Sequence, residues 1–80
     1  MPTIFRQDGF RVVIYTDDHE PPQVYVLKGE TEVKVDLGSI MILPTVILLR
    51  GKRRDATKAL EIVTDHQTEL LEAWRMIHGN

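Results

Sequence analysis

The stretch Asp18-His19-Glu20-Pro21-Pro22-Gln23-Val24-Tyr25-Val26 (residues 18–26) combines a turn, two prolines and the start of a strand. A residue before proline is forced into extended geometry, and proline has no N–H for a strand ladder, so Pro22 predicts a stiff entry into an edge strand. Side chains alternate along a strand. We therefore expect Gln23 and Tyr25 to share one face of a sheet and the neighbouring valines to share the other.

Other segments before residue 50 also have the composition of strands. Residues 3–6 and 10–16 are β-rich runs joined by Asp8-Gly9, a dipeptide typical of tight hairpins. Residues 31–37 alternate between apolar and polar side chains, which indicates a strand with one buried face. After Pro44, the β-branched composition of residues 46–49 predicts at least one further strand.

Residues 53–78 have the pattern of a helix. Asp55 is the expected N-terminal cap and Gly79 the expected C-terminal cap. We expect one unbroken helix; the alternative is a second start at Thr64-Asp65-His66-Gln67, which has the form of a capping box. The apolar stripe that should lie on the sheet recurs at steps of three and four residues and consists of Ala56, Ala59 or Leu60, Val63, Leu70, Trp74 and Ile77.

These patterns predict a single α+β domain over residues 1–80, with a small antiparallel sheet of four to five strands, mainly from residues 1–50, packed against one long C-terminal helix. The absence of cysteine excludes disulfides, thiolate metal sites and cysteine nucleophiles. The start Met-Pro-Thr-Ile has no features of a secretion signal, so we expect a cytoplasmic protein. The longest apolar run, residues 40–49, is too short to span a membrane and contains Pro44.

Basic side chains cluster immediately before the expected helix. The chain has a net charge of −2, yet residues 50–58 hold Arg50, Lys52, Arg53, Arg54 and Lys58 against Asp55 alone. Free N–H groups and the dipole at a helix N-terminus attract anions. We therefore expect these five basic residues to bind an anion, either a nucleic-acid backbone or an acidic protein surface; the alternative is a solvated basic loop without a ligand.

A second candidate site combines His19, Gln23 and Tyr25 near the expected strand with His66 on the helix stripe. If His66 lies over Tyr25 or His19, the group could act as a general acid, a general base or a polar clasp. The alternative is structural, with each histidine making one satisfying hydrogen bond. We expect neither a metal site nor a cofactor.

The third candidate is a partner interface, because almost every residue in 40–43 and 46–49 is apolar, whereas a strand with one wet face should alternate. Either both faces of this run are covered within the chain, or part of it is covered by a partner, for which a second copy of the chain is one candidate. The residues expected in the interface are Ile40, Met41, Ile42, Val46, Ile47 and Leu48.

Several segments resemble a family of small prokaryotic domains of unknown function whose signature is D-H-x-P-P-H-x-H. The resemblance is carried by Met1-Pro2-Thr3-Ile4, Phe10-Arg11, Asp18-His19-Glu20-Pro21-Pro22, Gly29, Arg50-Gly51, Lys58-Ala59-Leu60-Glu61-Ile62-Val63 and Leu70-Leu71-Glu72-Ala73-Trp74. Gln23 and Tyr25 stand where the family has two more histidines. Three histidines could hold a metal or move protons, whereas an amide and a phenol are poor metal ligands.

The resemblance also implies a gene context like that of a toxin and antitoxin pair, so the implied partner is the product of a neighbouring small gene. Our first interpretation is a non-enzymatic interaction module of such a two-gene regulatory unit, with a basic loop that binds an anion. One alternative is a small metal-independent ribonuclease-like toxin that uses His19 or His66 with Tyr25 and an arginine. The other is a purely structural subunit of a complex.

Overall fold

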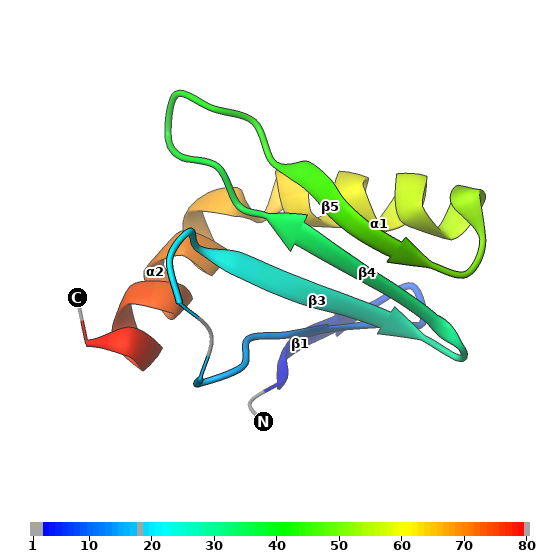
Figure 1. Ribbon diagram of the computed structural model, residues 1–80, viewed down its shortest axis with the longest axis horizontal. Coiled ribbons are helices and arrows are strands. Elements are labelled where there is room, and N and C mark those ends of the chain that lie inside the picture. Colours follow the sequence, from blue (N-terminus) through cyan, green and yellow to red (C-terminus); the bar gives the residue numbers. More distant parts are fainter. Residues whose placement is uncertain (1–2, 18, 80) are drawn as a thin grey trace.

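The structure, a computed structural model, describes residues 3–17 and 19–79 and places two helices on one face of a five-stranded sheet (Figure 1). The helices are α1 (Arg53–Asp65) and α2 (Gln67–His78). Met1, Pro2 and Asp18, which belong to the motifs that carry the resemblance, lie outside the described residues. The strands are β1 (Thr3–Gln7), β2 (Phe10–Val13), β3 (Gln23–Lys28), β4 (Thr31–Asp36) and β5 (Thr45–Arg50).

The sheet is an antiparallel meander in the order β1-β2-β3-β4-β5, which confirms the predicted α+β class and strand number. The hairpin at Asp8-Gly9 is also confirmed, with φ angles of 53° and 81°. Each strand therefore pairs with its neighbours in the sequence, and both ends of the strand order, β1 and β5, are edges.

The expectation that Pro22 opens an edge strand is wrong, because β3 is the middle strand and pairs with β2 and β4. Pro22 precedes the first residue of the ladder, so its missing N–H removes no sheet hydrogen bond. Its carbonyl instead accepts a hydrogen bond from the Leu37 N–H at 2.9 Å. The prolines fix where the strand begins without making it an edge.

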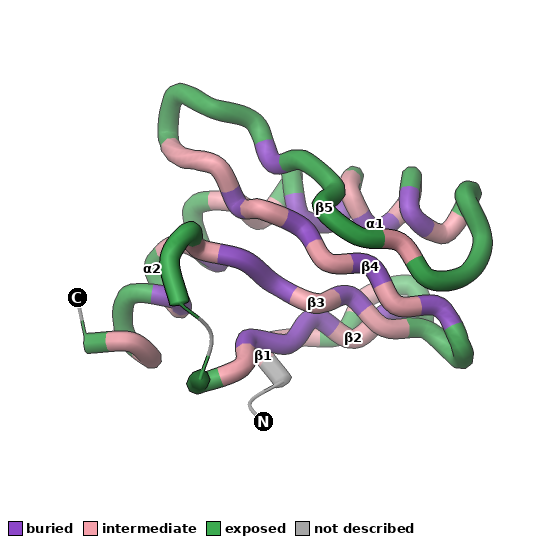
Figure 2. The backbone as a smooth tube through the Cα atoms, viewed as in Figure 1, coloured by how far each residue is buried: buried purple, intermediate pink, exposed green. Residues whose placement is uncertain are grey.

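The core lies between the sheet and the helices. Alternation places Val24 and Val26 of β3, with Val33 and Val35 of β4, fully buried beneath the helices, as Figure 2 shows by the purple segments along these strands. Each such side chain contributes about 1.5–3 kcal/mol through removal of apolar surface from water. The helices supply Ala56, Ala59, Ile62, Val63, Leu70 and Trp74, which largely confirms the predicted stripe.

The predicted cap at Asp55 is wrong, because α1 begins at Arg53 with Lys52 as its N-cap and without a side-chain cap. The Asp55 carboxylate is occupied elsewhere: it accepts a hydrogen bond from the Thr31 hydroxyl at 3.0 Å. Thr31 is buried at the start of β4. This contact, across 24 residues, ties the first turn of α1 to the sheet.

The predicted helical segment 53–78 is present but is divided at His66, where φ and ψ of −118° and 19° leave the helical region. The break thus lies where the alternative interpretation put it. Thr64 does not act as the cap of a new helix, because its hydroxyl donates to the Leu60 carbonyl one turn back at 2.7 Å. Gly79 ends α2 in the left-handed conformation, as predicted.

The connection between β4 and β5 projects from the sheet at the upper left of Figure 1. Its residues 39–43, called the apolar loop below, form a turn in which Ser39 N–H donates to Ile42 O at 3.0 Å and Ile42 N–H donates to Ser39 O at 3.1 Å. Gly38 has φ of 68°, and a Cβ at this position would overlap the Ile42 carbonyl oxygen. The turn therefore folds back tightly on its own base.

The Gln67 side chain fixes this turn to α2. Its Nε2 atom lies 2.8 Å from each of the carbonyl oxygens of Leu37, Ser39 and Ile42, to which it donates its two N–H groups. Gln67 is the first residue of α2, so the break at His66 places the amide beside the loop. One side chain thus satisfies carbonyls on both sides of the turn.

We predict that Gln67→Glu destabilises the protein by more than Gln67→Ala, for which we expect a loss of about 1–2 kcal/mol in the free energy of unfolding. The carboxylate has no N–H groups and would face three carbonyl oxygens. A glutamate in the first turn of a helix is otherwise stabilising by about 0.3–1 kcal/mol. A loss of stability in Gln67→Glu would therefore have the opposite sign to the usual effect of a glutamate there. Urea unfolding of both variants measures it.

Thr68→Glu is the matched control, because Thr68 is exposed in the same helical turn and should tolerate a glutamate without loss. Equal stability of the two glutamate variants would show that the amide does not anchor the loop.

Candidate functional site

The apolar loop exposes its hydrophobic side chains to solvent. Ile40, Met41, Ile42 and Leu43 are between 62% and 90% exposed. Val46, Ile47 and Leu48 on the following strand are between 37% and 50% exposed, so the run continues along β5 (Figure 2). All six residues of the predicted partner interface are therefore accessible in the isolated chain. Scattered surface hydrophobics are ordinary, but contiguous ones mark interaction surfaces.

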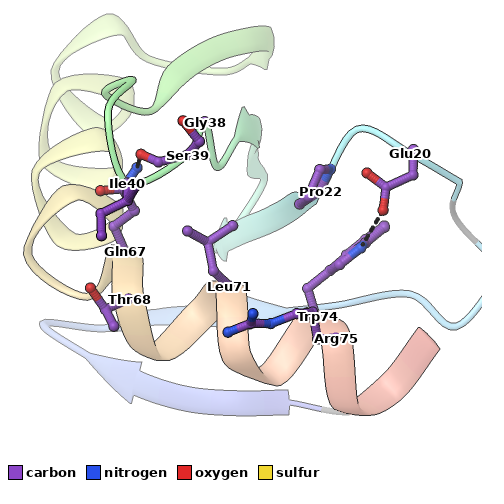
Figure 3. A pocket seen from close by; sticks show the side chains of 10 residues that line it. All are labelled: Glu20, Pro22, Gly38, Ser39, Ile40, Gln67, Thr68, Leu71, Trp74 and Arg75. Atoms are coloured by element: carbon purple, nitrogen blue, oxygen red, sulfur yellow. Dashed lines mark hydrogen bonds between the residues drawn. The ribbon is translucent and has the colours of Figure 1, made fainter. Parts of the chain in front are cut away.

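A groove of about 640 Å³ lies beside the apolar loop, between the loop, α2 and the segment before β3 (Figure 3). Pro22, Ile40 and Leu71 give it apolar walls, and Glu20 and Arg75 place opposite charges on its lining. Trp74 is almost fully buried, and its indole N–H donates to Glu20 Oε1 at 3.3 Å. The groove therefore combines apolar walls with two charged groups, as ligand-binding pockets commonly do.

The structure brings together only part of the second candidate site, which was expected to combine His19, Gln23, Tyr25 and His66. Gln23 is buried, and its Nε2 donates to the backbone carbonyls of His19 and Pro21 at 3.1 and 3.3 Å. The His19 residue thus meets Gln23 through its main chain. Tyr25 packs edge-on against Tyr15 with 4.6 Å between ring centroids, and Lys34 Nζ lies 5.6 Å from the Tyr25 centroid. These contacts stabilise the β2–β3 connection and the face of the sheet opposite the helices, called the open face below.

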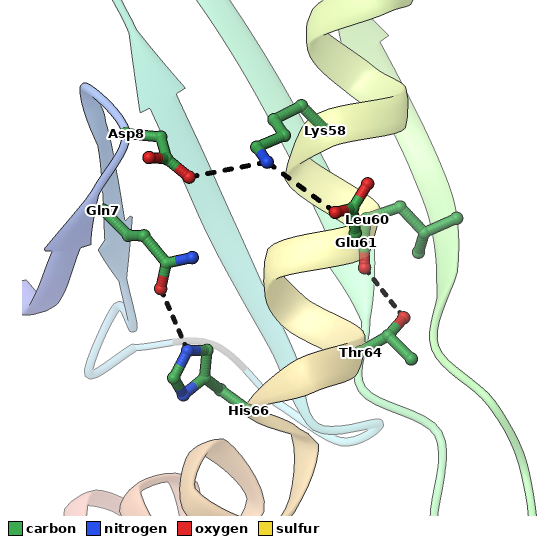
Figure 4. Close-up of polar contacts among 7 residues, drawn as sticks. All are labelled: Gln7, Asp8, Lys58, Leu60, Glu61, Thr64 and His66. Atoms are coloured by element: carbon green, nitrogen blue, oxygen red, sulfur yellow. Dashed lines mark hydrogen bonds and ion pairs between the residues drawn. The ribbon is translucent and has the colours of Figure 1, made fainter.

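His66 lies on the helix side of the sheet, opposite to Tyr25. Its Nε2 is 3.0 Å from Gln7 Oε1 and its Nδ1 is 3.1 Å from Glu69 Oε1; Figure 4 shows the contact with Gln7. The ring also packs against Phe5 with 4.6 Å between centroids. Because Tyr25 alternates with the buried Val24 and Val26, the sheet separates it from His66. The structure does not bring these two residues together.

The basic residues separate into two groups. Arg50, Lys52, Arg53 and Arg54 are exposed around the start of α1, and none of them belongs to an ion pair among the described residues. Lys58 instead lies one turn further along, with its Nζ 3.5 Å from Asp8 Oδ2 and 3.7 Å from Glu61 Oε1 (Figure 4). Lys58 therefore joins α1 to the β1–β2 turn, and the four other cations form the basic loop.

Sequence reasoning missed Gln67 and the groove. A glutamine that donates to backbone carbonyls 25–30 residues away leaves no pattern in the sequence, because backbone acceptors are the same at every position. The Trp74–Glu20 contact, across 54 residues, leaves no pattern either. The exposed apolar run, in contrast, was visible as a failure of alternation.

Within residues 3–17 and 19–79, no three His, Asp or Glu side chains are grouped so that they could hold a metal ion. Neither α1 nor α2 combines the length and hydrophobicity that a membrane-crossing helix requires.

Comparison with known proteins gives one family. No curated protein and no solved structure matches the chain significantly. The model of a domain of unknown function, DUF4160, matches residues 9–75, a range that runs from the β1–β2 turn to the last part of α2 and covers most of the 80 residues. The chain therefore belongs to the DUF4160 family of domains of unknown function.

Proposed function

We propose that the chain is a protein-interaction module of a small two-gene regulatory or toxin–antitoxin-like unit, and that the apolar loop with the adjacent groove binds the partner protein. The observation that supports this most strongly is that the loop has a fixed backbone but solvent-exposed apolar side chains. Its backbone is held by the Ser39–Ile42 hydrogen bonds and by Gln67, yet its apolar side chains point to water.

The energetics favour binding over internal collapse. Burying one large apolar side chain contributes about 1.5–3 kcal/mol, and ordering a flexible loop on binding consumes part of such a gain. Because the turn is already fixed, most of the burial energy of Ile40 and Met41 is available to the complex. A complementary partner would have an apolar patch against the loop and one side chain that enters the groove. The groove lining includes the charged residues Glu20 and Arg75. The gene context that the family resemblance implies makes the product of the neighbouring gene the first candidate.

We expect Met41→Asp to weaken binding of the neighbouring gene product at least ~30-fold, because a carboxylate at the tip of the loop must be desolvated in the complex. Met76→Asp is the matched control: Met76 is 83% exposed on α2, outside the apolar run. Co-expression, co-purification and calorimetric titration of the two variants measure the difference.

Equal binding by both aspartate variants would exclude the loop from the interface. A wild-type chain that binds no product of a neighbouring gene would remove the two-gene proposal itself.

A second candidate function is anion binding by the basic loop. Its four cations surround a helix N-terminus that has no side-chain cap, and the N–H groups of Asp55 and Ala56 both donate to the Lys52 carbonyl. The first helical N–H groups are left for another acceptor. Asp55 opposes an anion at this position, but its carboxylate is held by Thr31. A single-stranded nucleic-acid backbone is the anion that we propose, because it supplies several phosphates to adjacent cations.

We predict that Arg53→Ala with Arg54→Ala reduces binding of a fluorescent single-stranded RNA and lowers the slope of log affinity against log salt concentration by about 1.4, or about 0.7 for each phosphate that the variant no longer neutralises. Arg6→Ala removes an exposed arginine from β1, outside both the basic loop and the groove, and serves as the control for a positive charge lost elsewhere. Fluorescence anisotropy from low to physiological salt gives the slopes. An unchanged slope in the double variant would show that Arg53 and Arg54 neutralise no phosphate, which would contradict a phosphate site at the start of α1.

A further inference from the structure

The free edge of β5 carries a feature that the proposed binding of a partner at the apolar loop does not use. In the strand order, β5 pairs with β4 alone, so one row of its backbone N–H and C=O groups has no strand partner among the described residues. Proteins usually protect such edges with charges, prolines or covering elements. Residues 45–49 contain no charge, and Val46, Ile47 and Leu48 are exposed. Residues 45–49 of the edge therefore lack the charges that most directly oppose strand pairing.

We propose that the free edge of β5 pairs antiparallel with β5 of a second copy of this chain, which forms a two-fold symmetric, ten-stranded sheet. Thr45 lies opposite the partner's Arg50, Val46 opposite the partner's Leu49, and Ile47 opposite the partner's Leu48. The inference goes beyond the proposed function, because the apolar loop and the groove remain outside the paired strands.

The register of β5 supports a self-complementary pair. Thr45, Leu48 and Arg50 are cross-strand partners of Asp36, Lys34 and Glu32, so they lie on the open face of the sheet. Val46 and Leu49 are partners of the buried Val35 and Val33, so they lie on the helix face. A register shift between Lys34 and Val35 leaves Ile47 as the extra residue. In the proposed pairing Thr45 meets arginine on the open face, and Val46 meets leucine on the helix face.

The charges favour the antiparallel over the parallel orientation. Arg50 is the one charged residue of β5, and antiparallel pairing separates the two copies of it by about 17 Å, or five residues at about 3.3 Å each. Each Arg50 then lies beside the partner's Thr45, whose own neighbour on the same face is Asp36. The long arginine side chain can cross the small threonine toward that carboxylate. Parallel pairing in register would place the two arginines side by side.

The helices also fit this arrangement. α1 packs against both β4 and β5, so it lies near the edge at which the pairing is proposed. Two-fold pairing would bring the two copies of α1 to the same face of the joined sheet, on either side of the two-fold axis. Figure 4 shows Leu60 on the side of α1 toward β5 and Lys58 on the opposite side, toward the β1–β2 turn. Leu60 therefore places an apolar side chain, which packs partly on the core, on the β5 side of α1.

Sedimentation velocity at micromolar concentration tests the proposal. We expect wild-type protein at twice the 9.2 kDa chain mass and Ile47→Lys at the chain mass, because a charge on the paired edge opposes strand pairing. Met76→Lys, which places a lysine at an exposed position of α2, should remain dimeric. A monomeric wild type overturns the inference, as does an Ile47→Lys variant that is folded and still dimeric.

Cysteine cross-linking tests the register and does not depend on the lysine variant folding. The chain has no cysteine, so a mixture of Ile47→Cys and Leu48→Cys should form a disulfide-linked heterodimer as the main oxidised product. Equal cross-linking of Thr45→Cys with Leu48→Cys would contradict the register. If the wild type is monomeric but still binds the neighbouring gene product through Met41, the dimer is excluded and the proposed function stands.

Discussion

A single helical layer constrains the whole molecule. Two short helices cover one face of a five-stranded sheet, and the core valines of β3 and β4 lie beneath them. No helix among the described residues covers the opposite face of the sheet, so apolar side chains outside the contact between sheet and helices have no helical layer over them. The apolar side chains of residues 40–43 and 46–48 are in this position, and most of the exposed large apolar side chains among the described residues belong to this run.

The molecule uses polar contacts to hold this apolar surface in place. Gln67 closes the base of the loop, Asp36 accepts the Gly38 N–H at 2.8 Å, and Ser39 accepts the Met41 N–H at 3.3 Å. Each hydrogen bond contributes about 0.5–1.5 kcal/mol net to stability. Together they can hold a turn whose exposed apolar side chains contribute no burial energy. In an ordinary surface loop, polar groups face the solvent. In this loop, polar groups face inward and apolar side chains face outward, and the proposed binding role accounts for this arrangement.

Local patterns predicted much of the fold. The Asp8-Gly9 turn, the alternation in β4 and the three-and-four spacing in the helices each depend on neighbours in sequence, and each was confirmed. Two of the failures involve distant partners. Asp55 is a residue type that often caps helices, but its carboxylate accepts a hydrogen bond from Thr31. His66 lies on the apolar stripe of the helix, but its ring contacts Gln7 of β1. The candidate site was visible from composition in the apolar run, whereas Gln67 could not be found, because its acceptors are backbone atoms.

If the apolar loop is fixed before any partner binds, ¹⁵N relaxation of the isolated protein shows it most directly. We expect backbone order parameters of about 0.85 for Ile40, Met41 and Ile42, as for rigid strands. Values below about 0.6, with rigid strands in the same sample, would contradict a preformed binding surface, because the loop would then be an ordinary mobile connection with nothing fixed to offer a partner.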